Sequence, residues 1–396
     1  YAGATVAAWN PITPSTSVVD SFEKYCRRLR IDPGTGKKNY AIVQAEDELS
    51  AMGMVIGANW NGARAFTATS GPGVSLMSEF LGLAYFAEVP AVLVDVQRAG
   101  PSTGMPTRTQ QSDILAAAYA SHGDTKHVLF FPATPAECFS MTVEAFDLAE
   151  RLQTPIIIMS DLDLGMNEWM SPPLEFDDSY RYDRGKVLSG EDLEAMTERF
   201  GRYLDVDGDG IPYRTYPGAH PTKGAYFTRG SSRDEYAAYT EDGDVYVRNM
   251  DRLLKKFETA KSLVPEAKIK PAAESTKDAL LFFGTTASPA YEALETLEKE
   301  GIHLDTLRLR SFPFTQEVED FIEEHDRIFV IEQNRDGQMR RLLLNETNVE
   351  ANAKLISVVE YDGLPVTARK IASVIRGAMG INNVMPLVPK EKELAS

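Results

Sequence analysis

The first part of the chain alternates short apolar runs with longer segments of helical spacing. Buried strands are predicted at 40–43, 64–69, 90–96, 128–131 and 155–159. Helices are predicted at 47–60, 74–87 and 135–152. Strands that alternate with helices predict a parallel sheet covered on both faces, which is a doubly wound α/β domain. In such sheets ligands bind at the carboxyl ends of the strands.

A long irregular segment follows, and then the α/β pattern returns. Residues 170–262 are rich in Tyr, Arg, Asp, Pro and Gly, so we expect an excursion with short helices near 190–202 and 247–261 that covers a partner. Residues 265–277 are expected to be a linker. Further strands are predicted at 279–284, 303–307, 327–332 and 355–359. Further helices are predicted at 288–299, 315–324, 336–346 and 366–379, and the polar tail 388–396 is expected to be mobile.

These patterns divide the chain into three parts. We expect a doubly wound domain over 1–185, the excursion and linker over 186–274, and a second α/β domain over 275–396. A chain of 396 residues is long enough for two or three domains.

Charge and cysteine content exclude several classes of protein. A net charge of −17 argues against nucleic-acid binding, which needs a clustered basic face. Cys26 and Cys138 are too few for a disulfide framework, a zinc site or an iron–sulfur cluster held by this chain alone, and reduced thiols fit a cytoplasmic protein. No run of about 18 apolar residues predicts a membrane span. The chain begins at Tyr1 without Met, which we interpret as a processed or truncated start.

The stretch Pro11-Ile12-Thr13-Pro14-Ser15-Thr16-Ser17 predicts a stiff loop that leads into a helix. Both prolines fix φ and remove a backbone donor, and any of the three hydroxyls after Pro14 is a candidate helix cap. A helix N-terminus favours anions, so the loop is a candidate binding element. The plain alternative is a helix entry without further function.

Acidic residues cluster where the next helix begins, in Gln44-Ala45-Glu46-Asp47-Glu48. Helix-dipole and capping effects account for Glu46 and Asp47 on the exposed side. Glu48 differs because it leads an Ala/Gly-rich face that must pack closely, so its carboxyl group is expected to be partly buried and to need a partner. A ring nitrogen of a heterocycle is a suitable partner.

Two further junctions carry candidate binding residues. Thr69-Ser70-Gly71-Pro72-Gly73 joins a strand to a helix, and taken alone it is as well explained as a structural turn. Arg98 follows a buried strand, where its guanidinium can clamp a carboxylate; the alternative is an ion pair with one of the many acids. Thr107 lies further along the same loop.

Asp205, Asp207 and Asp209 are spaced like the start of a calcium loop, although Tyr216 occupies the place of the acidic residue at loop position twelve. The alternatives are a cation site and a solvated Asp/Gly turn. The five histidines form no metal-ligand spacing and no Ser-His-Asp pattern. A bound cofactor is therefore expected to carry the difficult chemistry.

Taken together, the motifs resemble the alpha subunit of 2-oxoacid:ferredoxin oxidoreductases, most closely the 2-oxoglutarate branch. The resemblance rests on four stretches in order: Pro-Ile-Thr-Pro-Ser-Thr-Ser, Gln-Ala-Glu-Asp-Glu, Thr-Ala-Thr-Ser-Gly-Pro-Gly and Val-Asp-Val-Gln-Arg-Ala-Gly-Pro-Ser-Thr-Gly. It extends over essentially the whole chain. One departure is Asn10, where the family usually has an aromatic residue.

The resemblance implies a pyrimidine-binding domain of thiamine-diphosphate enzymes over 1–185, and a transketolase C-terminal-like domain with 331–338 as its recognisable stretch. Glu48 matches the glutamate that binds and activates the cofactor, because Glu48-Leu-Ser-Ala51-Met-Gly53 fits the family's spacing. Thr13 and Arg98 match residues that hold the substrate carboxylate, and Thr107 is a further candidate contact. Pro11, Ile12, Ser70 and Gly71 are the other expected cofactor contacts.

The resemblance also implies partners. A beta subunit would hold the diphosphate, Mg²⁺ and a [4Fe–4S] cluster, a gamma domain would be fused or separate, and two alpha and two beta chains would form a heterotetramer. The implied reaction is oxidative decarboxylation of 2-oxoglutarate with coenzyme A and ferredoxin. The alternatives left open are pyruvate, branched-chain 2-oxoacids or oxalate as substrate, a transketolase-type reaction without electron transfer, and a non-catalytic scaffold subunit.

Overall fold

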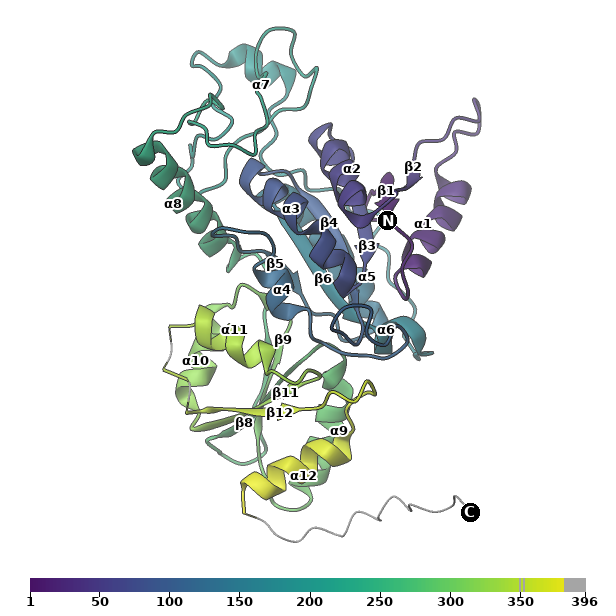
Figure 1. Ribbon diagram of the computed structural model, residues 1–396, viewed down its shortest axis with the longest axis vertical. Coiled ribbons are helices and arrows are strands. Elements are labelled where there is room, and N and C mark those ends of the chain that lie inside the picture. The colour runs from purple at the N-terminus through teal and green to yellow at the C-terminus, as the bar shows by residue number, and fades with distance from the viewer. Residues whose placement is uncertain (349, 352, 381–396) are drawn as a thin grey trace.

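Two sheets organise the chain in the computed structural model, which describes residues 1–348, 350, 351 and 353–380 (Figure 1). The first has seven strands in the order β10-β5-β6-β4-β3-β1-β2, and the second has five in the order β12-β11-β8-β9-β7. The strands of the first sheet are β1 (Val6–Trp9), β2 (Ala41–Gln44), β3 (Ala65–Thr69), β4 (Ala91–Gln97), β5 (Val128–Phe130), β6 (Pro155–Asp161) and β10 (Ser311–Phe312). The pairs within this sheet are parallel except that of β10 with β5.

Helices cover both faces of the first sheet. These helices are α1 (Thr16–Leu29), α2 (Glu48–Trp60), α3 (Gly71–Ala87), α4 (Ile114–Ala118), α5 (Pro135–Leu152) and α6 (Leu162–Met166). Phe66 and Val92, which are paired across β3 and β4, face the side of α1 and α5. Thr69, three residues beyond Phe66, points to the opposite face and lies against Gly73 of α3. The predicted doubly wound arrangement is confirmed.

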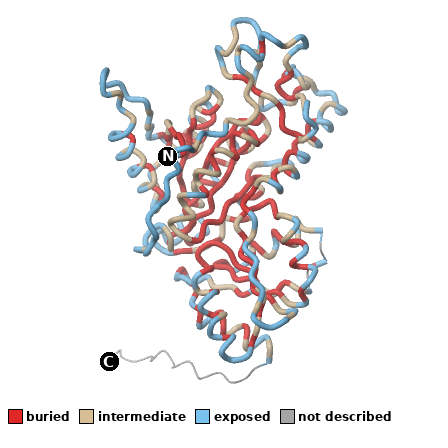
Figure 2. Tube along the Cα trace, turned by 180° about the vertical axis from the view of Figure 1, so that it is seen from behind, coloured by how far each residue is buried: buried red, intermediate tan, exposed pale blue. Residues whose placement is uncertain are grey.

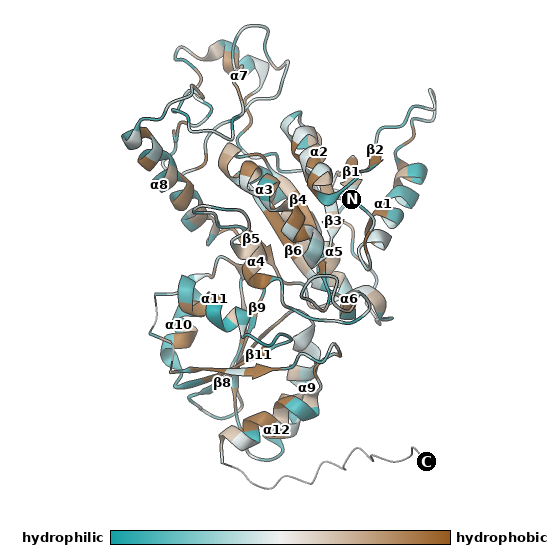
Figure 3. Ribbon diagram, viewed as in Figure 1, coloured by the Kyte–Doolittle hydropathy of each residue, from teal (hydrophilic) through white to brown (hydrophobic). Residues whose placement is uncertain are grey.

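The second sheet is also wrapped by helices on both sides (Figure 1). Its strands are β7 (Lys268–Lys270), β8 (Asp278–Phe283), β9 (Asp305–Leu309), β11 (Arg327–Glu332) and β12 (Leu355–Val359). A 3₁₀ turn η1 (Gly284–Thr286) and helices α9 (Ala287–Glu298), α10 (Gln316–Glu324), α11 (Gln338–Glu346) and α12 (Ala368–Ala378) complete this part. The central strands of both sheets are apolar and buried (Figures 2 and 3).

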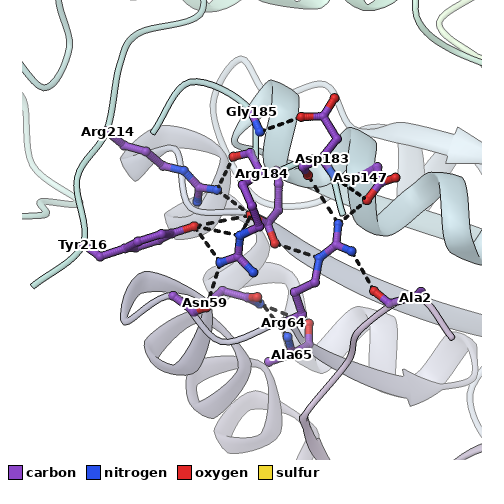
Figure 4. A network of polar contacts seen from close by, with 12 residues as sticks. Ala2, Asn59, Arg64, Ala65, Asp147, Asp183, Arg184, Gly185, Arg214 and Tyr216 are labelled. Carbon is purple, nitrogen blue, oxygen red and sulfur yellow. Dashed lines mark hydrogen bonds and ion pairs between the residues drawn. The ribbon is translucent and has the colours of Figure 1, made fainter. Parts of the chain in front are cut away.

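The excursion is held against the first sheet by buried charges. It contains α7 (Gly190–Ala195) and α8 (Gly243–Ala260). Glu150 of α5 accepts hydrogen bonds from Arg64 at 2.9 Å and from Arg214 at 2.7 Å, and it pairs with Arg184 at 2.8 Å. Figure 4 shows how the three arginines converge. Each of these arginines comes from a different segment, so the cluster fixes residues 184–214 to α5 and to the start of β3.

A second buried cluster surrounds Glu88, which caps the C-terminus of α3 in the left-handed region with φ 59°. Its carboxylate accepts from Arg252 at 3.0 Å and from Lys256 at 2.9 Å, both on α8. Burial alone raises the pKa of Glu88, but the charges of Arg252 and Lys256 outweigh it and hold the pKa below the ordinary value. Arg202 adds a hydrogen bond to the Glu88 carbonyl oxygen at 2.7 Å. Residues 202–256 are therefore locked to the end of α3.

Most predicted elements are confirmed with boundary shifts of a few residues. Three strands were not predicted: β1, β7 within the expected linker, and β10, which joins the first sheet although it lies beyond residue 275. The expected division into 1–185, 186–274 and 275–396 stays a prediction. Residues 388–396 lie outside the described part of the chain. Among the described helices, none is both long and apolar enough to cross a membrane.

Candidate functional site

Arg98 meets the 11–17 loop at the carboxyl end of the first sheet. Its Nη1 atom donates a 2.7 Å hydrogen bond to the carbonyl oxygen of Thr13. Arg98 is 6% exposed, and its Nε atom is buried without a partner. The Thr13 side chain is exposed, so a carboxylate placed beside it has both a hydroxyl and a guanidinium within reach. The alternative considered for Arg98, an ion pair with an acid of the chain, is not formed within 4.0 Å among the described residues.

The hydroxyls after Pro14 do not cap α1. The Oγ atoms of Ser15 and Thr16 instead donate to the Ile12 carbonyl oxygen at 3.0 and 3.3 Å. The expectation of a side-chain cap was therefore wrong, because Ser15 at the cap position already has helical backbone angles and its hydroxyl bonds backwards to a carbonyl oxygen. Pro11 is exposed and Ile12 half-buried beside this turn.

Glu48 is the first residue of α2 and is 8% exposed. Asp47 before it caps the helix by accepting from the Ser50 N–H at 2.6 Å, as the capping interpretation predicts. A Cβ on Gly73 would lie 2.8 Å from Glu48 Cγ and 1.8 Å from Thr69 Oγ1, so the glycine allows α3 to pass close over this carboxylate. Among the described residues, no hydrogen bond or ion pair engages the Glu48 carboxyl group.

Ser70 and Gly71 lie where β3 passes into α3. The Ser70 hydroxyl is buried without a hydrogen-bond partner and does not cap the helix. A Cβ on Gly71 would lie 2.6 Å from an oxygen of Asp113, so this turn is also built around a close approach. Gln97 links Asp113 to β4, because its Oε1 accepts from the Asp113 N–H at 3.2 Å.

Asp95 and Asp113 form a buried acid pair beside Arg98 that the sequence analysis missed. Both carboxylate oxygens of Asp95 and the Oδ2 of Asp113 are buried without a partner. Burial, and then the charge of Asp113, raises the pKa of Asp95. Burial also raises the pKa of Asp113, although the Arg98 charge opposes it. The one available signal was a charged residue inside the otherwise apolar run at 90–96.

Thr107 is exposed in the loop after Arg98, and no side-chain hydrogen bond joins it to Arg98 or Thr13. The neighbouring backbone is fixed by a hydrogen bond from the Ala99 N–H to the Arg108 carbonyl oxygen at 2.9 Å. A role for Thr107 in substrate binding stays a prediction.

The expectation of a cation site at Asp205, Asp207 and Asp209 is corrected by the structure. Lys186 pairs with Asp207 at 2.7 Å and with Asp209 at 2.8 Å. Asp205 accepts instead from the backbone of Gly208 and Gly210. Within the described residues, no group of three acidic, His or Cys side chains could hold a metal ion. The lysine and the backbone donors occupy the carboxylates, so the segment is the Asp/Gly turn.

An apolar hollow of about 820 Å³ lies on the other face of the sheet, between α1 and α5. Val92, Val94 and Val96 of β4 line it, and neither Glu48 nor Arg98 does. Glu48 and Arg98, at the carboxyl ends of β2 and β4, are therefore separate from this hollow. Together with Thr13 after β1 and Ser70 after β3 they form a half-site, in which the Ser70 hydroxyl and the Nε atom of Arg98 are buried without a partner.

The fold and this half-site define an α/β chain of the thiamine-diphosphate-enzyme class. A family model described as "Pyruvate flavodoxin/ferredoxin oxidoreductase, thiamine diP-bdg" matches residues 1–195. The 2-oxoglutarate synthase subunit KorA of Methanothermobacter thermautotrophicus is 33% identical over 353 residues, which cover 85% of each chain. The chain belongs to the family of 2-oxoacid:ferredoxin oxidoreductase alpha subunits.

Some relatives are longer. The 2-oxoacid:ferredoxin oxidoreductase 2 alpha subunit of Aeropyrum pernix is 34% identical over 384 residues, which cover 94% of this chain and 58% of the relative. The chain thus spans little more than half the length of such relatives. A solved 2-oxoglutarate:ferredoxin oxidoreductase from Magnetococcus marinus, with 2-oxoglutarate, coenzyme A and succinyl-CoA bound, superimposes with a TM-score of 0.84 at 27% identity over 95% of this chain and 62% of that one. A split-gene transketolase shares the fold at 12% identity, with a TM-score of 0.50 over 95% of this chain and 92% of that one.

The residues present fit the aminopyrimidine end of thiamine diphosphate. Glu48 is 8% exposed, its carboxyl group has no protein partner among the described residues, and Gly73 lets α3 pass close to it. A carboxyl group held at this place without a protein partner is available to an external hydrogen-bonding group. The Ser70 hydroxyl is buried without a hydrogen-bond partner.

Proposed function

We propose that this chain is the alpha subunit of a thiamine-diphosphate-dependent 2-oxoacid:ferredoxin oxidoreductase that acts on 2-oxoglutarate. The reaction would join the succinyl group to coenzyme A, release CO₂ and pass electrons singly to ferredoxin, and it would be reversible. The observation that supports the proposal is that Arg98 after β4 bonds to Thr13 after β1, and that Glu48 follows β2, the neighbour of β1 in the same sheet. Its relatives' names support the same activity.

Each residue then has a definite task. The Glu48 carboxyl group would hold the aminopyrimidine ring and exchange a proton with its ring nitrogen. Arg98 would bind the 2-oxoacid carboxylate, and its bond to the Thr13 carbonyl oxygen would fix the guanidinium plane. Thiamine diphosphate, when bound, supplies the nucleophile that adds to the keto carbon. These side chains orient and stabilise rather than react covalently.

Partners complete the proposed site. A beta subunit would hold the diphosphate, Mg²⁺ and a [4Fe–4S] cluster, and a gamma domain would be fused or separate. The free thiols of Cys26 and Cys138 leave cluster binding to the partner. Met54 on α2 and Leu76 on α3 are exposed at 43% and 56%, which leaves a partner apolar side chains on these two helices. Two alpha and two beta chains, and a cytoplasmic location, remain predictions.

Purification of the chain with its natural partners tests the proposal. The complex should contain thiamine diphosphate and iron, and it should reduce ferredoxin when 2-oxoglutarate and coenzyme A are supplied. Pyruvate, branched-chain 2-oxoacids and oxalate tested in parallel decide the substrate.

Glu48→Gln tests the catalytic role. It should abolish turnover while the subunits still assemble, because an amide cannot exchange the proton. Glu46→Gln, two residues earlier and exposed, is the matched control and should keep full activity. Normal turnover by Glu48→Gln would instead support a scaffold role, and a complex free of iron would support a transketolase-type reaction.

A further inference from the structure

The segment from Arg98 to Asp113, which we call loop 98–113, lies against the part of the chain that carries the second sheet. The Thr109 N–H donates to the Gly363 carbonyl oxygen at 3.1 Å. The Gln111 N–H donates to the Gln333 carbonyl oxygen at 2.8 Å. Helix α4, which follows the loop, packs beside α11 (Figure 1). The loop therefore begins in the half-site, and its far end contacts segments that connect the strands and helices around the second sheet.

Two side chains bind the main chain of this segment: Asn334, in the connection between β11 and α11, and Gln338, the first residue of α11. Asn334 Nδ2 donates to the Gln111 carbonyl oxygen at 2.9 Å. Gln338 Nε2 donates to the Ser112 carbonyl oxygen at 2.6 Å, and Gln338 Oε1 accepts from the Leu115 N–H at 3.1 Å. These bonds engage backbone groups, so they fix the path of the segment whatever side chains it carries.

Asn334 and Gln338 are themselves held in place. The Asn334 Oδ1 accepts from the Gln338 N–H at 3.1 Å, and its Nδ2 also donates to Glu332 at 2.8 Å. Glu332 is fully buried and accepts from the N–H groups of Met339 at 2.7 Å and Arg340 at 3.0 Å. We call Asn334 and Gln338 together the clamp. Their side chains are held by the N-terminal turn of α11 and by the buried Glu332.

The clamp is connected to the half-site by a short path. Asp113, one residue beyond Ser112, donates its N–H to Gln97, whose neighbour is Arg98. An oxygen of Asp113 also lies 2.6 Å from where a Cβ on Gly71 would be. A displacement at residues 111–113 would therefore reach Arg98 and the start of α3 together.

We propose that Asn334 and Gln338 are positioning residues, which clamp loop 98–113 so that Arg98 presents its guanidinium to the substrate carboxylate. This inference rests on the proposed function for its catalytic consequence. If the loop is already ordered before substrate binds, binding does not have to supply the free energy of ordering it. A small misplacement of the group that binds the substrate, here Arg98, lowers the catalytic rate.

Two substitutions of nearly unchanged size test the clamp in the full chain purified with its partners. Asn334→Asp removes the donor to Gln111 and to Glu332. Gln338→Glu removes the donor to Ser112 while it keeps the acceptor for Leu115. Gln316→Glu is the control, because the Gln316 amide bonds only to Asp320 on its own helix among the described residues. Amide hydrogen exchange of a peptide spanning 105–116 and the KM for 2-oxoglutarate are measured for each.

The double variant should exchange about ten-fold faster over 105–116, with β4 unchanged. Its KM should rise about ten-fold while kcat changes less, and Gln316→Glu should match the unmodified protein. Unchanged exchange overturns the clamp, and faster exchange with unchanged KM overturns its positioning role. A parent complex that turns over no 2-oxoacid contradicts the proposed function alone, and the exchange comparison then still decides whether the clamp exists.

Discussion

The Nη1 atom of Arg98 lies 2.7 Å from the carbonyl oxygen of Thr13, which joins the end of β4 to the loop that precedes α1. The two residues are 85 positions apart in sequence, yet one hydrogen bond fixes the guanidinium against the exposed Thr13 side chain. The Nε atom of Arg98 is buried without a partner, and no hydrogen bond within the described residues engages Nη2.

Replacing Arg98 should therefore weaken the transition-state complex more than it weakens the fold. We expect Arg98→Ala to reduce kcat/KM for 2-oxoglutarate by the equivalent of about 2–4 kcal/mol, since a partly enclosed carboxylate loses its counter-charge. Steady-state kinetics of the purified complex measures this. Arg108→Ala, in the same loop but exposed, is the control, and equal effects of the two changes would remove Arg98 from the site.

Gly73 should tolerate no side chain. We expect Gly73→Ala to cost roughly 1–3 kcal/mol of unfolding free energy and to displace Glu48, because its Cβ would overlap Thr69 Oγ1. Gly57→Ala in α2 meets nothing within 4 Å and should stabilise the chain by about 0.5–1 kcal/mol. Denaturant titration compares the two variants, and a neutral Gly73→Ala would contradict the close approach of α3 to Glu48.

The acid pair makes stability depend on pH in a definite direction. The folded pKa values of Asp95 and Asp113 are raised by burial, so the folded state holds a proton more tightly than the unfolded state. The contribution of these two groups to the free energy of unfolding is full below the pKa of a free aspartate, about 4, and it is lost as pH rises towards neutrality. Asp113→Asn should make the free energy of unfolding fall less as pH rises, because the amide does not ionise.

Thermal unfolding between pH 5 and pH 8 checks the prediction. The melting temperature of Asp113→Asn should fall less with rising pH than that of the unmodified protein. Parallel curves for the two proteins would show that Asp113 is already ionised at pH 5.

Glu88 should be among the most sensitive positions for stability. Glu88→Gln leaves Arg252 and Lys256 buried without a counter-charge, which costs about 3–5 kcal/mol for a buried pair. Glu300→Gln breaks the exposed pair with Arg376 and should change the unfolding midpoint little. Similar midpoints for the two variants would mean that the excursion is not held by this cluster.

Sequence patterns were sufficient to locate a strand where most of its residues are buried. Strands β4, β6, β8 and β11 are predominantly apolar runs, so the sequence pattern alone located them. Strand β1 is short and rich in alanine, β7 reads Lys-Ile-Lys, and β10 has two residues. These strands exist because of their neighbours in the sheet, which a local pattern does not contain.

The candidate site shows the same limit. Glu48 and Arg98 could be identified because their surroundings in sequence demand special packing or directly follow a strand. The pairing of Asp95 with Asp113, and of Lys186 with Asp207 and Asp209, joins distant segments. Nothing near Asp207 in sequence indicates that a lysine 21 positions earlier will neutralise it.

Strand β10 gives the first sheet an outer border that is encoded far from the rest of that sheet. Ser311 and Phe312 pair with Phe130 and Leu129, so a gene fragment that stopped near residue 275 would leave the apolar β5 as an unpaired edge strand. Exposed apolar edge strands pair with strands of other molecules and promote aggregation. The halves of this chain are thus unsuited to separate expression, and a workable split would have to carry β10 along with the first half.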